Sequence, residues 1–259
     1  MFIKVPVLTV KNCNLSVLSV LTAIVMVSLF PHPSNAQLMR SLRVNLRFPP
    51  VTDLGAPKRT SGAGSRGPAC SSYQFNNSTV VENIETRKIP LTALTPGNNL
   101  ITTAEPQATV FVYIPNATDK NGTFRLIDIK TEQIVYQQSI SFVTTPGIVK
   151  ISIPETVQLQ QDSIYQWQVL VICNPQDREA DELVEGWIKY TPLTSEQATQ
   201  IQKLMPNSLA QVRLYAQFGF WNQALVILDQ LRKNNSQAQV LWQELLTYVR
   251  LAEIAEVSN

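Results

Sequence analysis

Short apolar runs separated by turn residues define the middle of the chain. Between residues 90 and 192 these runs are rich in Val, Ile, Tyr and Phe, and several alternate apolar with polar positions. They lie at 108–115, 122–130, 133–142, 147–154, 164–173 and 183–190. The run at 164–173 is the most apolar, so we expect it to be the central strand. Six or seven short antiparallel strands in about 100 residues predict a β-sandwich.

The stretch "LQQDSIY" indicates which kind of β-sandwich to expect. It places Leu159 six residues before Tyr165, at the start of the central strand. This spacing resembles the tyrosine corner of immunoglobulin-like and fibronectin-like sandwiches, in which the phenol bonds to nearby backbone. Trp167 stands where an immunoglobulin domain has its strand cysteine, and Cys173 lies at the far end of the strand. We therefore expect an antiparallel immunoglobulin-like β-sandwich without its usual core disulfide.

The pattern changes from strand to helical spacing after residue 192. Thr194 or Ser195 is a suitable helix start, and apolar positions at helical spacing follow on both sides of Gly219. The stretch "YAQFGFWNQALVILDQLRKNN" (215–235) resembles half of a tetratricopeptide repeat. The predicted fold class is α+β, a sandwich over 90–192 followed by a small helical segment over 193–259. The helices of this segment form a hairpin that either caps the sandwich, which we favour, or forms a groove for a partner peptide.

The N-terminus has the pattern of an export signal. Residues 1–14 carry two lysines and no acid, residues 15–30 are apolar, and "PHPSNA" follows. We predict a signal peptide over 1–36, cleaved between Ala36 and Gln37. An uncleaved anchor is the alternative, although a run of 16 residues is short of the about 20 that span a bilayer. The expected location is periplasmic or extracellular, with no stable membrane span after cleavage.

Loss of the signal would also remove the only histidine, His32. A mature chain without histidine excludes Ser-His-Asp and Cys-His centres and His-ligated metal sites. We predict no catalytic residues, no cofactor, no metal and no nucleic-acid partner. Cys70 and Cys173 remain, and an oxidising compartment favours a disulfide between them. Two separate buried thiols are the alternative.

Charge is divided unevenly along the mature chain. Residues 37–70 hold six basic residues and one acid, whereas 90–259 hold 11 basic and 16 acidic residues. We assign 37–89 to a basic arm, in which the Gly-, Pro- and Ser-rich stretch 49–69 is a disordered linker. The segment "VNLRFPP" could add an edge strand. The arm could dock on the acidic body, support self-association or touch an anionic surface, but simple solubility is the interpretation we favour.

A cluster of acidic residues lies between the last two predicted strands. The acids at 177, 179 and 181 resemble the start of a calcium loop, but Glu182 replaces its glycine and Ile188 its twelfth-position acid. A carboxylate pair for glycoside hydrolysis is a second possibility, with Trp187 or Tyr190 stacking a sugar. A solvated hairpin tip is the interpretation we favour, and a protein-contact loop is a further one. That contact loop would comprise Asp177, Arg178, Glu179, Asp181 and Trp187.

Several stretches together resemble a known family. They are "LTALTP", "ATVFVYIP", "TPGIVKISIP", "IYQWQVLVICNPQDR", "VEGWI", "LYAQFGFWNQAL" and "LWQELL". Over residues 70–255 they resemble the domain of unknown function 928 family, mostly cyanobacterial exported proteins. The resemblance implies a signal peptide, an extracytoplasmic location and a cysteine in the "VICNPQDR" motif, where Asn174 replaces the aspartate of the family pattern. It implies no particular activity.

Two hypotheses on function follow. The first is an exported, non-catalytic binding or structural module of the cell envelope, whose partner is an envelope protein or a glycan. The alternative is an envelope glycan hydrolase that uses a carboxylate pair.

Overall fold

The computed structural model describes residues 46–50, 53–56, 89–115, 121–142, 146–173, 175–176, 178–249 and 251–257. All of them belong to one unit of the chain, Val44–Asn259. The predicted signal peptide with its cleavage site, Cys70, Asn174, Asp177 and most of the basic arm lie outside the described residues.

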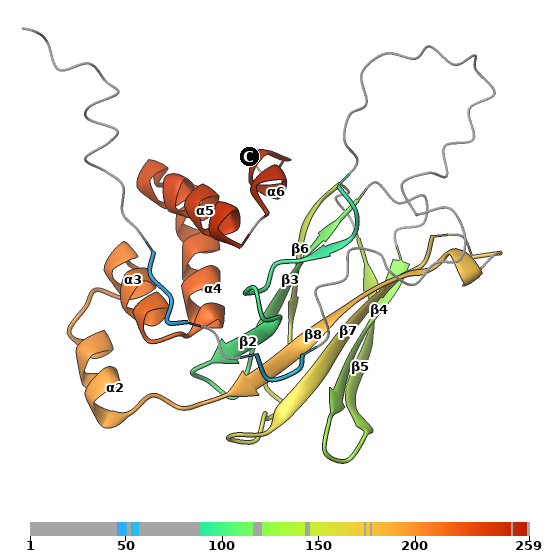
Figure 1. Ribbon diagram of the computed structural model, residues 1–259, viewed down its shortest axis with the longest axis horizontal. Coiled ribbons are helices and arrows are strands. Elements are labelled where there is room, and N and C mark those ends of the chain that lie inside the picture. Colours follow the sequence, from blue (N-terminus) through green and yellow to red (C-terminus); the bar gives the residue numbers. More distant parts are fainter. Residues whose placement is uncertain are drawn as a thin grey trace, which may run out of the picture. The chain divides into compact units, whose positions relative to one another are not determined.

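Two β-sheets form the first part of this unit (Figure 1). The three-stranded sheet has the order β1-β3-β6 and the five-stranded sheet the order β2-β8-β7-β4-β5. The α+β class and the sandwich are therefore confirmed, and β3 to β8 each begin and end within two residues of a predicted run. The strands are β1 (Thr92–Ala93), β2 (Leu100–Thr103), β3 (Thr109–Ile114), β4 (Asn121–Asp128), β5 (Gln133–Ser141), β6 (Gly147–Ser152), β7 (Ile164–Val171) and β8 (Glu182–Tyr190).

One strand pair differs from the prediction of a wholly antiparallel sandwich. The edge strand β2 pairs in parallel with β8, with Leu100 opposite Trp187 and Thr103 opposite Tyr190. The chain leaves the three-stranded sheet after β1, and it joins the other sheet at β2. Asn99, in the left-handed region at φ 56, turns the backbone just before β2. A strand of four residues was too short to give a recognisable pattern in the sequence.

The two sheets differ in how many of their faces are covered. Along β7 buried and partly exposed residues alternate, as expected for a strand with one covered face. Strand β7 is the middle strand of its sheet, which confirms its predicted central position. From Val110 to Ile114, β3 is buried at every residue. Its second face is covered by helices, since Phe111 packs against Trp242 with ring centroids 6.4 Å apart.

The C-terminal part consists of helices. They are α2 (Ser195–Gln202), α3 (Leu209–Gln217), α4 (Trp221–Leu231), α5 (Ser236–Tyr248) and α6 (Ala252–Val257). Thr194 begins α2 with a capping box, in which its hydroxyl accepts the Gln197 N–H and the Gln197 side chain accepts the Thr194 N–H. Between α3 and α4 stands Gly219 at φ 85, a backbone conformation that side chains disfavour.

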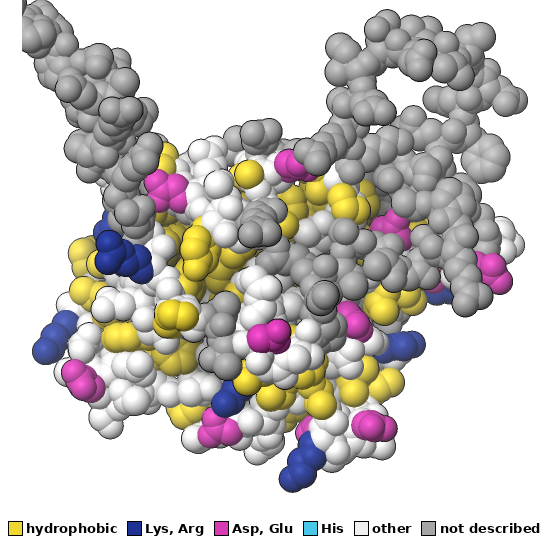
Figure 2. All heavy atoms as spheres, viewed as in Figure 1, with side chains coloured by type: hydrophobic (Ala, Val, Ile, Leu, Met, Phe, Trp, Pro, Cys, Tyr) yellow, Lys and Arg dark blue, Asp and Glu magenta, His cyan; other side chains and the backbone are white. Residues whose placement is uncertain are grey.

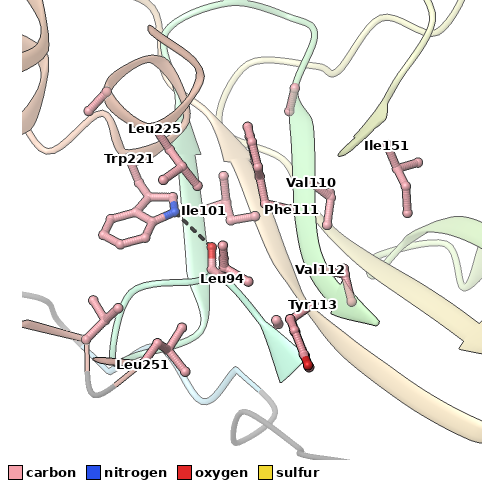
Figure 3. Packing of buried hydrophobic residues seen from close by; sticks show 14 of the residues in the cluster. Leu94, Ile101, Val110, Phe111, Val112, Tyr113, Ile151, Trp221, Leu225 and Leu251 are labelled. Carbon is pink, nitrogen blue, oxygen red and sulfur yellow. Dashed lines mark hydrogen bonds between the residues drawn. The ribbon is translucent and has the colours of Figure 1, made fainter. Parts of the chain in front are cut away.

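Helix α4 packs on β2 and β3, and buried polar side chains fix its position. The Trp221 indole N–H donates to the Leu94 carbonyl at 3.2 Å, with Ile101 and Leu225 nearby (Figure 3). Asn222 donates to the Thr109 carbonyl at 2.8 Å. These bonds join residues more than a hundred positions apart in the chain, so they specify how the helices dock as well as stabilise them.

Gln223 adds two further bonds to the same junction. Its amide oxygen accepts the Ala104 N–H at 2.9 Å, and its amide nitrogen donates to the Thr103 hydroxyl at 3.0 Å. The β2 end of the five-stranded sheet is thereby tied to α4. In Figure 1 the helices lie on the β2 and β3 side, while β4, β5 and β7 lie on the side away from them.

Candidate binding surfaces

The acidic hairpin between β7 and β8 is held by its own side chains. Arg178 binds the Asp181 carboxylate through Nη2 at 2.6 Å and through Nε at 2.7 Å. The other Asp181 oxygen accepts the backbone N–H of Cys173 at 3.3 Å. The Asp181 side chain is consequently only 8% exposed. These bonds give Asp181 a structural role in closing the loop, whereas Glu179 is exposed to solvent.

Trp187 lies apart from the hairpin tip. It is part of β8 and stands opposite Gln166 of β7. It lies six positions after Asp181, a distance of about 20 Å along the strand at the usual rise per residue. Of the predicted contact loop, the structure thus brings Arg178 and Asp181 together and places Trp187 on the open face of the five-stranded sheet.

The two residues of the tyrosine-corner pattern lie at the start of β7. Leu159 is buried, and the Tyr165 hydroxyl accepts the backbone N–H of Gln160 at 3.1 Å. The phenol therefore bonds to backbone five residues upstream. This contact fixes the connection that leads from β6 into the central strand.

The carboxylates and cysteines of the described part of the chain do not gather into a cluster of three that could hold a metal ion. Within the same residues no helix has both the length and the apolar character needed to cross a membrane.

A groove of about 830 Å³ lies beside β2. Its volume falls in the range of small-ligand pockets. One wall is the segment Phe48–Pro50 with Leu54, the second is the Pro96–Asn98 loop with the β2 and β8 ends, and the third is the α3–α4 turn with Tyr248 and Val249. Hydrophobic side chains are exposed over this helical part, with few charged ones among them (Figure 2). We call this concavity the arm groove.

The first wall of the arm groove belongs to the basic arm. Phe48 packs on Trp221 with ring centroids 5.1 Å apart. Pro49 lies so close to Gly219 that a Cβ there would come within 3.1 Å of its ring. Residues 46–50 are not in a strand, so "VNLRFPP" adds no edge strand over the part that the structure describes. This contact was not predicted, because the linker was predicted to begin at Pro49; the adjacent aromatic residue and proline, Phe48 and Pro49, could have indicated it.

The fold and these surfaces define a β-sandwich protein with a C-terminal helical segment and a groove between them. The chain belongs to the family described as Domain of Unknown Function (DUF928), which matches residues 61–258. No curated protein matches the chain.

Two solved structures show weak similarity. The FN5 domain of Drosophila Lar is 17% identical at a TM-score of 0.22, covering 40% of this chain and 92% of that one. Astrotactin-2, described as a conserved vertebrate-specific and perforin-like membrane protein, is 10% identical at a TM-score of 0.27. That match covers 65% of this chain and 35% of the Astrotactin-2 chain. At these TM-scores neither neighbour defines the fold of this chain.

Proposed function

We propose that this protein is an exported, non-catalytic binding module of the cell envelope, and that the arm groove receives an extended segment of a partner protein. The observation that carries the proposal is the packing of Phe48 and Pro49 against Trp221 and Gly219. The proline-containing segment Phe48–Pro50 already packs at this place through side-chain contacts. The remaining volume beside it is lined by apolar and aromatic side chains together with the polar side chains of Asn98, Thr102 and Thr191. It therefore suits a second segment that has apolar side chains and a backbone to be hydrogen-bonded.

The chemistry of the groove favours a segment with apolar side chains. Tyr248 is 64% exposed and Leu54 is 46% exposed, and because both line the groove, apolar surface there is open to a partner. Among the described residues that line the groove, Lys189 is the single charged one, and it is paired with Asp162 at 3.2 Å.

A site-specific crosslink tests this function. We would place a photoreactive phenylalanine analogue at Tyr248, in the groove, and as a matched control at Met205, which is 79% exposed and outside it. After irradiation of cells, the Tyr248 protein should give a discrete protein adduct in the envelope fraction and the Met205 protein should not. Adducts of equal yield at both positions, or none at Tyr248, would refute groove binding.

Export is the part of the proposal that rests on the sequence. The apolar run at 15–30 and the small residues before Gln37 support a cleaved signal. N-terminal sequencing of the envelope protein should begin at Gln37. Recovery of the uncleaved chain from the cytoplasm would contradict the location.

The finer fold assignment is also proposed. We infer that the sandwich is immunoglobulin-like, supported by its sheet orders and by the Tyr165 phenol bond to backbone. We infer too that α3 and α4 form a tetratricopeptide-like hairpin, supported by Gly219 between them and by the fully buried Ala224. An experimental structure compared with known sandwiches and repeats would decide both.

We further propose a disulfide between Cys70 and Cys173. Cys173 is buried just beyond the end of β7, and export would place both cysteines in an oxidising compartment. Thiol titration of the denatured, unreduced protein should find no free thiol in the exported chain. Two thiols per chain would refute the bond.

The hydrolase alternative receives less support from the geometry. Asp181 accepts from Arg178 and from the Cys173 N–H, and Glu185 accepts from two glutamine amides. Asp181 thus closes the hairpin and its side chain is 8% exposed, whereas both members of a catalytic pair must face a substrate.

A further inference from the structure

The open face of the five-stranded sheet carries a polar row that crosses four strands. On β8, β7 and β4 the buried residues alternate with Glu185, Gln168 and Arg125, so these side chains point away from the core. The register sets Glu185 opposite Gln168, Gln168 opposite Arg125, and Arg125 opposite Gln137 of β5. At the usual spacing between strands, four strands give a row about 14 Å long.

Hydrogen bonds hold the row in place. One oxygen of Glu185 accepts from the side-chain amide of Gln166 at 2.8 Å and from that of Gln168 at 3.0 Å. The Arg125 Nε donates to the Gln137 amide oxygen at 3.0 Å. Each of these side chains has more donor or acceptor positions than these bonds use. The row therefore presents donors and acceptors on rigid strands, where little ordering is needed before a ligand binds.

Trp187 stands next to the row. It lies opposite Gln166 and two residues from Glu185 on the same face of β8. It is partly exposed, whereas the other three tryptophans, Trp167, Trp221 and Trp242, are at most 2% exposed. An indole beside amide and carboxylate groups offers an apolar surface next to hydrogen-bonding groups.

We propose that this face, formed by Trp187, Gln166, Gln168, Glu185, Arg125 and Gln137, binds a neutral polysaccharide. A pyranose ring has an apolar C–H face that stacks on an indole, and hydroxyls at its rim that both donate and accept hydrogen bonds. Charge complementarity selects a neutral ligand, because Arg125 and Glu185 balance each other within the row. The length of the row exceeds one sugar ring, so a chain of rings fits better than a single sugar. None of these six residues is among those that line the arm groove.

Affinity electrophoresis of the full exported protein tests the proposal. The gels would contain hydroxyethylcellulose or dextran as neutral glucans, or alginate as an acidic polymer. We expect retardation by at least one neutral glucan and not by alginate. The variant Trp187→Ala should weaken that binding at least about tenfold, Gln168→Ala should weaken it less, and Met205→Ala should leave it unchanged.

Tryptophan fluorescence gives a second measurement, which does not require the Trp187→Ala variant to fold. Because the other tryptophans are buried, acrylamide quenching reports mainly on Trp187, and the retarding glucan should protect the native protein from it. No retardation by either neutral glucan, retardation by alginate alone, or undiminished retardation of a folded Trp187→Ala protein would each overturn the proposal. Loss of the Tyr248 crosslink would instead contradict only groove binding.

Discussion

Two aspartates bind an arginine three residues away, but in different settings. Asp229 on α4 accepts from Arg232 at 2.9 Å and also from Lys150 of β6 at 2.8 Å. Asp181 accepts from Arg178 at the tip of the acidic hairpin. Through Lys150, Asp229 joins the helical layer to the three-stranded sheet across 79 positions of sequence. The second pair closes a local loop.

The difference shows that a pair's role depends on what lies around it. The Arg232 guanidinium also lies over the Trp242 ring, 4.4 Å from its centroid, and Trp242 packs on Phe111. Asp229 is therefore part of the buried helix–sheet junction. Arg178 is 55% exposed, so water competes for its partner. We expect substitutions at the junction to lower stability much more than substitutions in the hairpin.

The largest effect should come from the aromatic centre of the junction. Trp221→Ala should lower the free energy of unfolding by about 3–5 kcal/mol, because it leaves a cavity and an unpaired Leu94 carbonyl. Urea denaturation followed by circular dichroism measures the change. Met205→Ala, at an exposed site, should stay within about 0.5 kcal/mol. A loss below about 1 kcal/mol for Trp221→Ala would mean that α4 contributes little to the sandwich.

Removing the charge of Asp229 should have the next largest effect. Asp229→Asn should cost about 1–3 kcal/mol, because the partly buried Arg232 loses its carboxylate, while Lys150 can still reach water. Lys150→Met should cost less, since Arg232 remains with Asp229. If both variants unfolded at the same urea concentration as the wild-type protein, the expectation that substitutions at the junction lower stability more than those in the hairpin would be wrong.

Acid should remove the contribution of Asp229. Burial alone would raise the pKa of this carboxyl, but hydrogen bonds from Lys150 and Arg232 outweigh burial and hold the pKa below its ordinary value of 3.8. A lowered folded-state pKa stabilises the protein above the unfolded-state pKa, and the contribution is lost as pH falls through the folded-state value. The stability difference between wild type and Asp229→Asn should therefore narrow below about pH 3.8. A difference that widens with acid would contradict this sign.

The smallest effect should come from the hairpin. Arg178→Ala should change the unfolding free energy by about 0.5 kcal/mol or less, as is usual for an exposed arginine in a local ion pair. The same urea titrations measure it. A loss as large as that of Asp229→Asn would show that the hairpin tip is as important to the fold as the junction.

Local patterns in the sequence were sufficient for the long strands and for the helix starts. Strands β3 to β8 carry alternation or length enough to be recognised, and the Thr194 cap depends only on Gln197 three residues later. Strands β1 and β2, with two and four residues, were missed. No local pattern predicted that Asn222 and Gln223, two amides after Trp221 at the start of an apolar helix, would be buried.

The sequence by itself determined the α+β class, the order of strands before helices and the family, because these depend on residue periodicity and on motifs within short stretches. Only the tertiary structure decided that Phe48, Asn98, Gly219 and Tyr248 line one groove, and that Arg125, Gln168 and Glu185 form one row. The physical reason is that both surfaces depend on strand register and on helix docking. Those are set by contacts such as Trp221 with Leu94, between residues 127 positions apart, which no local pattern encodes.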